Sequence, residues 1–301
     1  MHHLVGTLLV ALSAAAFGTL AIFGRYAYAD GMDTFTILFL RFSLAAAFML
    51  VLLMLRRERL PRGAVLARLL GMGAIGYVGQ AFAYLTALKY ASAGLVALLL
   101  YLYPVFVALL AAMLLHERIT AVKGFALGLA LLGTALTVGP AGGQALGVLL
   151  AVSGAVIYSI YIIVGTHVMK QVSAVQSSAV IFSAAAVSSG VLMALHGPHP
   201  PATGAGWAAV ASIVLIATVL PVAAFLAGLG RIGPTNAAML STLEPVVTVL
   251  FAVVWLHETL KPLTWLGGGL ILAAVLLVTR GELRLTFPRA GAKGRMLDEE
   301  T

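Results

Sequence analysis

The sequence predicts an all-α integral membrane protein with ten transmembrane helices, arranged as two inverted repeats of five helices with both termini cytoplasmic. Of the 301 residues, 62% are hydrophobic and only 9% are charged, and the mean hydropathy is +1.08. Soluble domains carry about a quarter charged residues, so these few charges cannot cover a surface that faces water. The composition excludes a soluble enzyme and makes the lipid bilayer the expected surroundings.

Each predicted helix is an apolar run long enough to cross roughly 30 Å of hydrocarbon, which takes about 20 helical residues. Clusters of Gly, Pro and charged residues separate the runs, for example at 139–143 and 196–201. The first run lacks the basic start of a signal peptide and stays apolar to Ala27, so we expect an uncleaved span. The ten expected spans are 4–27, 34–55, 65–88, 93–115, 121–138, 145–168, 174–196, 207–230, 235–256 and 262–279.

The distribution of Lys and Arg predicts the orientation. With a cytoplasmic N-terminus, 14 of the 18 basic residues fall in inner loops and the C-terminal segment, and the outer loops keep Lys89 and Lys261. The two others, Arg25 and Arg41, lie within spans. The positive-inside rule therefore places both termini in the cytoplasm. Because the net charge of +8 is spread along one membrane face, we expect no nucleic-acid partner.

An internal repeat appears when the sequence is shifted by 141 residues, so that Pro104 aligns with Pro245. Between Pro104 and Leu136, 11 of the 33 aligned pairs are identical. The predicted organisation is a first repeat at 4–138, a second at 145–279 and a basic cytoplasmic tail at 280–301. The offset contains five spans, an odd number, so the second copy is expected upside down. Inverted repeats are typical of secondary transporters with a midplane site.

Several short motifs resemble one family. The repeat, the Leu-Tyr-Pro and Leu-Glu-Pro stretches at 102–104 and 243–245, the Leu-His-Glu ends of spans 4 and 9, and Arg41 are similar to the drug/metabolite transporter superfamily of EamA type. This resemblance implies a multi-pass protein of the bacterial inner membrane that exports amino acids and related metabolites. Within the family, the whole chain most resembles the YddG-type aromatic amino acid exporters.

Two ionisable residues lie deep within predicted spans, where each needs a partner or a wet cavity. Arg41 is about 12 Å along span 2, and Glu244 is about 13 Å along span 9 from the opposite face. Either they contact a zwitterionic substrate or a coupling proton, or they form a structural ion pair or polar anchors between helices. Their similar depth also allows a mutual pair.

Aromatic residues and one amide are the other candidates for substrate contacts. Tyrosine combines an apolar face with a hydroxyl and so suits amphiphilic amino acids, although an interfacial or packing role is the alternative. Gln80 shares one helix face with tyrosines three residues before it and four after it. The candidates are Tyr77, Gln80, Tyr84, Tyr101, Tyr103, Tyr158 and Tyr161.

Three prolines and two glutamates are candidates for hinges or gates. Pro104, Pro245 and Pro221 interrupt spans 4, 9 and 8, where proline kinks a helix, either as a hinge or as static packing. Glu117 and Glu258 end spans 4 and 9 after a histidine, as loop anchors at the starts of spans 5 and 10 or as gates.

The sequence contains no motif for a metal site, a cofactor or ATP hydrolysis. The His-Glu pairs lack the second histidine of a zinc motif, cysteine is absent and there is no phosphate-binding loop, so we expect no metal, cofactor or ATP hydrolysis. Glycines 124, 128, 267, 268 and 269 suit close packing of spans 5 and 10 or a dimer surface, so the protein is expected as a monomer or homodimer. The predicted function is export of amino acids by alternating access. The alternatives are efflux of drugs or other metabolites and, less favoured, an integral membrane enzyme.

Overall fold

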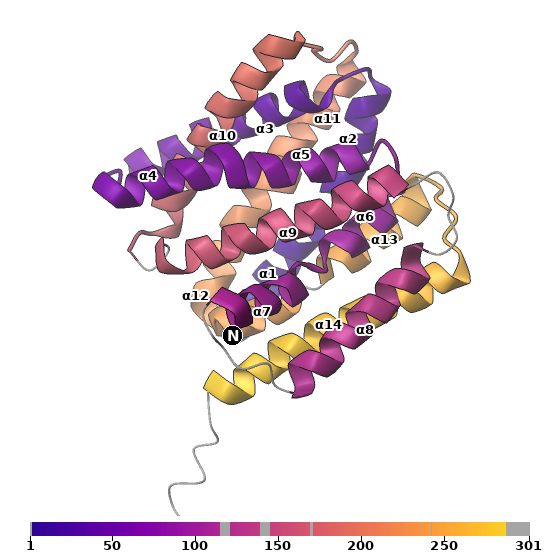
Figure 1. The fold of residues 1–301 in the computed structure, drawn as a ribbon. Coiled ribbons are helices and arrows are strands. Elements are labelled where there is room, and N and C mark those ends of the chain that lie inside the picture. Colours follow the sequence, from indigo (N-terminus) through magenta and orange to yellow (C-terminus); the bar gives the residue numbers. More distant parts are fainter. Residues whose placement is uncertain (1, 115–120, 139–144, 169–170, 242, 287–301) are drawn as a thin grey trace, which may run out of the picture.

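The computed structural model describes residues 2–114, 121–138, 145–168, 171–241 and 243–286, and within these ranges the regular secondary structure is entirely helical (Figure 1). Glu117 and most of the expected tail lie outside the described residues. The helices of the first half are α1 (His2–Gly18), α2 (Leu20–Ala29), α3 (Thr34–Leu55), α4 (Gly63–Gly71), the π-helix η1 (Met72–Tyr77), α5 (Val78–Ala87), α6 (Ala93–Leu100), α7 (Tyr103–Leu114) and α8 (Ala121–Val138).

The second half has the corresponding order of elements. Its helices are α9 (Ala145–Val168), α10 (Ala174–His196), α11 (Gly204–Val214), the π-helix η2 (Leu215–Val219), α12 (Leu220–Ser241), α13 (Leu243–Trp255) and α14 (Pro262–Thr286). Helix α14 continues seven residues beyond the expected end at 279. Span 4 is divided between α6 and α7, and span 1 between α1 and α2.

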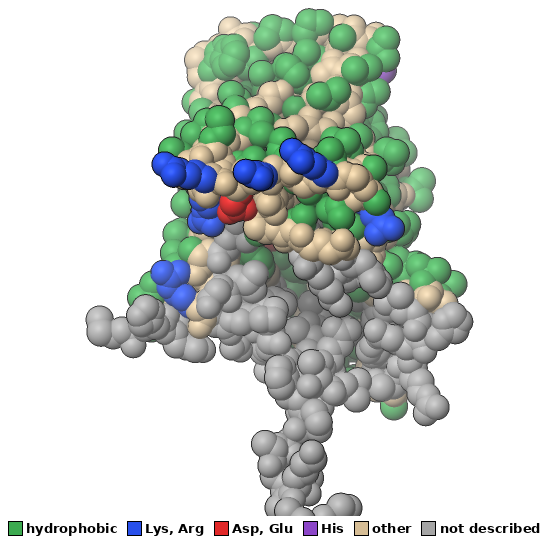
Figure 2. All heavy atoms as spheres, turned by 90° about the vertical axis from the view of Figure 1, so that its left-hand side faces the viewer, with side chains coloured by type: hydrophobic (Ala, Val, Ile, Leu, Met, Phe, Trp, Pro, Cys, Tyr) green, Lys and Arg blue, Asp and Glu red, His purple; other side chains and the backbone are tan. Residues whose placement is uncertain are grey.

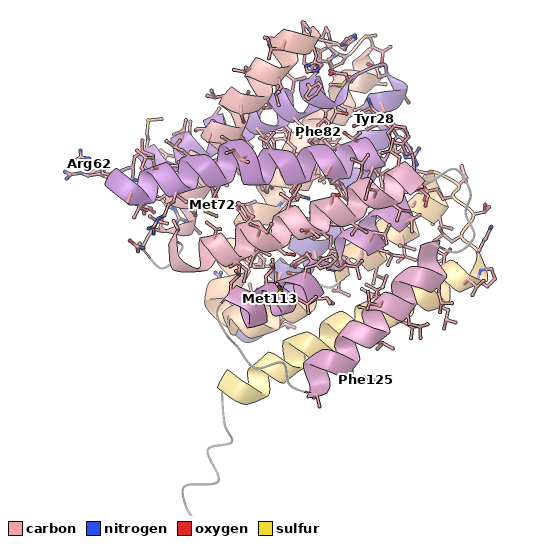
Figure 3. All side chains as sticks on the ribbon, in the orientation of Figure 1. Tyr28, Arg62, Met72, Phe82, Met113 and Phe125 are labelled. Atoms are coloured by element: carbon pink, nitrogen blue, oxygen red, sulfur yellow. The ribbon has the colours of Figure 1, made fainter. Side chains whose placement is uncertain are left out.

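The chain forms an all-helical membrane protein. Six described segments are long and apolar enough to cross a bilayer: Leu4–Ala29, Thr34–Leu55, Gly63–Ala87, Ala145–Gly165, Ala174–His196 and Gly204–Phe225. Four shorter apolar helices complete a set of ten: Ala93–Val107, Gly124–Gly133, Leu243–Trp255 and Pro262–Ala274. Large apolar side chains point away from the bundle, as Phe125 does from α8 in Figure 3, where it is 66% exposed. Such a surface is stable in lipid and not in water.

Helix α12 contains a reversal of the chain. The helical backbone is continuous from Leu220 to Ser241, through the break expected between 230 and 235. Val10 nevertheless packs against both Phe225 and Leu240. Fifteen residues of straight helix would hold those two side chains about 22 Å apart. The chain therefore turns back within α12, and the second leg leads into α13.

The two halves interleave. Helix α3 packs along α10, α8 along α14, α1 along α12 and α5 along α9, so each pair takes one helix from each half (Figure 1). Helices α3 and α10 run antiparallel, because Phe35 stacks on His196 at one end and Glu58 accepts a hydrogen bond from Ser173 at the other. The core consequently lies between the halves and not within either of them.

The contact between α8 and α14 depends on a glycine that the sequence pattern did not single out. A Cβ at Gly133 would lie 2.7 Å from the Gly267 carbonyl oxygen, so only glycine fits there. Gly124, Gly128 and Gly269 face open space, and a Cβ at Gly268 would meet Leu98. Spans 5 and 10 pack together as expected, with Gly267 in the contact, but Gly124 and Gly128 do not make it, because the two helices approach one another further along α8. The alternative role of these two glycines in a dimer surface stays a prediction.

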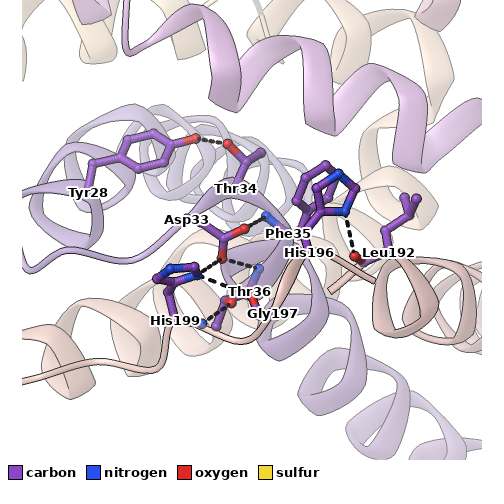
Figure 4. Close-up of polar contacts among 9 residues, drawn as sticks. All are labelled: Tyr28, Asp33, Thr34, Phe35, Thr36, Leu192, His196, Gly197 and His199. Carbon is purple, nitrogen blue, oxygen red and sulfur yellow. Dashed lines mark hydrogen bonds and ion pairs between the residues drawn. The ribbon is translucent and has the colours of Figure 1, made fainter. Parts of the chain in front are cut away.

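Basic side chains gather on one face, which we call the basic face (Figure 2). It is defined by Arg56, Arg57, Arg59 and Arg62, which lie between α3 and α4, and by Arg68 in the last turn of α4. The opposite face carries the loops before α3 and after α10. There Asp33 caps α3 by accepting hydrogen bonds from the amides of Phe35 and Thr36, and the His199 amide donates to the Thr36 hydroxyl (Figure 4). These bonds fasten the loop of one half to the first turn of a helix in the other.

Candidate functional site

Two helix crossings lie at the centre of the bundle. Where α1 gives way to α2, a Cβ at Gly18 would lie only 2.8 Å from the Glu244 carbonyl oxygen, and the Thr248 hydroxyl donates to the Gly18 carbonyl at 2.9 Å. In the other crossing the Ser159 hydroxyl of α9 lies 3.0 Å from the Tyr103 carbonyl of α7. Gly18 and Tyr103 correspond to Ser159 and Glu244 at the 141-residue offset, so the two crossings are equivalent.

The acidic part of the site is formed by Tyr101 and Glu244. The Tyr101 hydroxyl lies 2.6 Å from the Ser241 carbonyl oxygen and 3.0 Å from Glu244 Oε2. Tyr101 is buried and occupies the break between α6 and α7, which directs its side chain across to the first turn of α13. The second carboxylate oxygen, Oε1, makes no hydrogen bond to the described residues, so one acceptor of this deep carboxylate is free.

The basic part is formed by Arg41 of α3. The side chain is 4% exposed, and its Nε donates to the Thr218 hydroxyl at 3.0 Å. Thr218 in turn donates to the Ile213 carbonyl within the π-helical segment of α11–η2–α12. The Nη1 and Nη2 atoms of Arg41 make no hydrogen bond to the described residues, yet neither is fully buried. Both atoms therefore border accessible space. Four N–H groups of this guanidinium thus make no hydrogen bond to the described residues.

Arg41 and Glu244 do not form an ion pair within the part of the chain that the structure describes. Each instead makes one hydrogen bond to an uncharged hydroxyl from the other half of the protein. The buried Tyr84 of α5 interacts electrostatically with both charges, so it lies within range of each. The pair is held apart, and each keeps unused hydrogen-bonding capacity.

A row of aromatic rings, which we call the tyrosine ladder, connects the two charged groups. At one end Tyr101 bonds to Glu244; at the other Tyr77 contacts Phe42, whose ring centroid lies 5.4 Å from the Arg41 guanidinium. Such centroid separations are those of favourable aromatic pairs. The ladder runs through Tyr101–Tyr103 (5.7 Å), Tyr103–Tyr158 (4.8 Å), Tyr158–Tyr161 (5.8 Å) and Tyr161–Tyr77 (5.9 Å).

At three positions of the site, a polar residue in one repeat aligns with an aromatic residue in the other. Arg41 bonds to Thr218, whereas the equivalent Phe182 lies with its ring 5.8 Å from that of Tyr77. Backbone geometry is therefore shared by the two halves while side-chain chemistry differs. At the 141-residue offset the related positions are Arg41 and Phe182, Tyr77 and Thr218, and Tyr103 and Glu244.

Comparison with known proteins identifies the family. The sequence model of the EamA-like transporter family matches residues 4–139 and again residues 145–280. The chain belongs to the EamA-like transporter family. It is therefore a membrane transporter and not an enzyme.

Relatives of this EamA-like transporter cover nearly all of the chain. An "Uncharacterized transporter" of Archaeoglobus fulgidus is 27% identical over 277 residues, which are 91% of this chain and 96% of that protein. The "Uncharacterized inner membrane transporter YedA" of Escherichia coli is 26% identical over 80% of both chains. A solved structure described as "Crystal structure of protein" has the same fold, with a TM-score of 0.65 and 23% identity over 91% of this chain and 97% of that one. None of these names carries a substrate, and none points to aromatic amino acid export.

Most of the candidate residues predicted from the sequence of this EamA-like transporter meet in the structure. Arg41, Glu244, Tyr84 and the tyrosine ladder form one continuous group. Gln80 is half-buried on α5, and its amide makes no hydrogen bond to the described residues.

The prolines and Glu258 take places that the sequence analysis did not anticipate. Pro104 stands in the first turn of α7, directly after the turn at residues 101–102, where a missing N–H costs nothing. Pro245 lies in α13, whose described residues begin at Leu243. Pro221 follows η2, and its carbonyl accepts from the Ser13 hydroxyl at 2.7 Å. Glu258 binds the start of α6 through the Ala93 and Gly94 amides. The expectation that it anchors span 10 was wrong, because the open N–H groups nearest to it belong to span 4.

Thr218, Ser159 and the two π-helices were not predicted from the sequence. The π-helices occur at nearly equivalent positions of the two halves, Met72–Tyr77 and Leu215–Val219, and π-helical turns are frequent at functional sites. A signal existed for Thr218, since it is the repeat equivalent of Tyr77, which was a candidate. A residue that corresponds to a candidate in the other repeat is therefore itself a candidate for the site, even where the residue type differs.

Proposed function

We propose that this EamA-like transporter exports amino acids from the cytoplasm, with a preference for aromatic ones, by alternating access between two inverted repeats. The observation that carries the proposal is that Arg41 and Glu244 lie at the two ends of the tyrosine ladder without pairing with one another. A free guanidinium fork suits a carboxylate, and a free carboxylate oxygen suits an ammonium group. The rings between them offer flat apolar contact to a side chain.

The proposed mechanism follows from the interleaved halves. The antiparallel course of α3 and α10, which occupy equivalent places in the repeat, supports inversion of one half relative to the other. Inverted halves allow two packings of similar energy that open the midplane site to opposite sides. Breaks in α1–α2 and α6–α7 beside the site supply places where the helices bend.

The proposed orientation and location rest on charge and on a relative. We place the basic face and both termini in the cytoplasm, because Arg and Lys accumulate on the side that is not translocated. The Escherichia coli relative is described as an inner membrane transporter, which supports the inner membrane as the location.

Flux measurements in proteoliposomes test the substrate class. Vesicles with the purified protein are expected to exchange labelled phenylalanine above protein-free vesicles, and leucine more slowly. Tyr101→Phe, which removes the hydroxyl bonded to Glu244, should reduce this exchange, while Tyr26→Phe, at a 46% exposed position away from the site, should not. Ethidium flux without amino acid flux would contradict the proposal and favour drug efflux.

A further inference from the structure

A charged cavity, which we call the outer cavity, lies on the face opposite the basic face, outside the tyrosine ladder. It has a volume of about 590 Å³ and lies between α2, the connection from α5 to α6, and the residues that follow α13. Figure 3 shows how far this region is from the basic face: Tyr28, whose ring Lys89 covers, lies at the other side of the bundle from Arg62. The residues that give the cavity its chemistry are Arg25, Tyr26, Lys89, Tyr90, Ser92 and Glu258.

The single carboxylate of this cavity is already engaged. Glu258 accepts hydrogen bonds from the Ala93 amide at 2.7 Å and from the Gly94 amide at 3.2 Å, which are the first N–H groups of α6. It therefore compensates the positive end of the α6 dipole as well as facing Arg25, whose Nη2 lies 3.8 Å from its Oε1. The single negative charge of Glu258 therefore interacts both with the start of α6 and with the Arg25 guanidinium.

The two cations of the cavity have donors to spare. Arg25 uses Nη2 for the Ala91 carbonyl at 2.6 Å, and its Nη1 makes no hydrogen bond to the described residues. Lys89 holds its ammonium group 4.7 Å from the centre of the Tyr28 ring and makes no hydrogen bond to the described residues. The cavity thus has two positive side chains, one shared negative side chain and unoccupied N–H groups.

The placement of these cations is unusual for the sequence. Outside the basic regions the chain carries only Arg25, Arg41, Lys89 and Lys261, and two of these four converge on one cavity. Arg25 lies within α2 and Lys89 in a loop, and Glu258 is the one acidic side chain among the described lining residues, so the cavity keeps an excess of positive charge that an anion would compensate.

We infer that this cavity binds an oxyanion, either the carboxylate of a small organic acid or the phosphate of a lipid headgroup, held by Arg25 and Lys89. Guanidinium and ammonium groups together form strong charge-assisted hydrogen bonds to either kind of oxygen. The exposed rings of Tyr26 and Tyr90 suit an amphiphilic molecule at the membrane interface. This inference depends on the contacts of the outer cavity and not on the proposed substrate of the central site.

Protection of Lys89 from an amine-reactive reagent tests the site in the full-length protein without any substitution. The rate of acetylation by a water-soluble succinimidyl ester is followed by mass spectrometry at Lys89 and at Lys261, an exposed lysine outside the cavity that serves as the internal control. The probes are benzoate, with benzyl alcohol as its uncharged counterpart, and phosphatidylglycerol, with a neutral glycolipid as its counterpart. A bound oxyanion should slow the reaction at Lys89 about fivefold or more and leave Lys261 unchanged.

The outcomes are distinct. Protection by benzoate assigns the site to a soluble carboxylate, and protection by phosphatidylglycerol alone assigns it to a lipid phosphate. Arg25→Gln should weaken protection about tenfold in probe concentration, because it removes a charge-assisted contact. The inference is overturned if neither anion protects Lys89, if the uncharged counterparts protect equally, or if Lys261 is protected to the same extent.

Discussion

Replacing Arg41 by lysine should damage binding of carboxylates while sparing ligands that have none. Lysine keeps the positive charge but lacks Nε and therefore the hydrogen bond to Thr218, and it replaces a planar fork by one ammonium group. A charge-assisted hydrogen bond contributes about 1.5–3 kcal/mol, so losing one of two parallel bonds to a carboxylate lowers affinity about ten- to a hundredfold. The structure thus predicts a large and selective effect from a substitution that conserves charge.

Two analogues of phenylalanine, 3-phenylpropionate and phenethylamine, separate the contribution of the carboxylate from that of the ammonium group in an equilibrium binding assay on purified protein. Arg41→Lys should weaken binding of 3-phenylpropionate, which has only the carboxylate, and leave that of phenethylamine, which has only the ammonium group, within about twofold. Thr218→Val keeps the guanidinium and should lower carboxylate affinity less than Arg41→Lys does. Arg68→Lys, at an exposed position of α4, is the matched control. Equal weakening of both ligands by Arg41→Lys, or no weakening, would refute this account of Arg41.

Three further predictions concern the acidic group, the helix crossing and the loops opposite the basic face. Glu244→Gln should reverse the selectivity, weakening phenethylamine about tenfold and sparing 3-phenylpropionate, in the same binding assay. Gly18→Ala should lower the free energy of unfolding by about 1–3 kcal/mol, because the new Cβ would lie 2.8 Å from the Glu244 carbonyl oxygen. Gly124→Ala should not lower it, because Gly124 faces open space. Thermal unfolding followed by size-exclusion chromatography compares the two variants. Hydrogen bonds, chiefly from the Thr203 hydroxyl, hold the pKa of Asp30 below its ordinary value of 3.8, so the wild type should exceed Asp30→Asn in unfolding temperature at pH 7 and lose this advantage as the pH falls below 3.8.

The membrane spans and the charged centre were accessible from the sequence because lipid imposes simple rules on both. An apolar run of about 20 residues is required for each crossing, and Arg41 and Glu244 stand out as rare deep charges. What hydropathy cannot see is how a span is interrupted. Leu102 is as apolar as the leucines before it, yet α6 ends at Leu100, and Pro104 lies in the first turn of a new helix instead of kinking an old one.

Contacts set by tertiary packing were equally out of reach. Thr218 looks like any polar residue in a span until the π-helix directs its hydroxyl to both Ile213 and Arg41. Glu258 lies in a loop, and nothing local indicates that it caps a helix 165 residues earlier in the chain. In both cases the partner comes from the other half, so the information lies in the interleaving of the repeats.

Helix α6 links the outer cavity to the central site. It has eight residues and therefore spans about 12 Å, and Ala93 to Leu99 are all buried. The second half of the protein holds both of its ends: Glu258 binds the first amides, and Ser241 and Glu244 accept from Tyr101 just beyond the last turn. A short, largely buried helix moves as one body, so a rearrangement that displaces α6 must either carry both contacts along or break both. The contacts of Glu258 with the first amides of α6 and of Glu244 with Tyr101 just after its last residue should therefore change together when α6 moves.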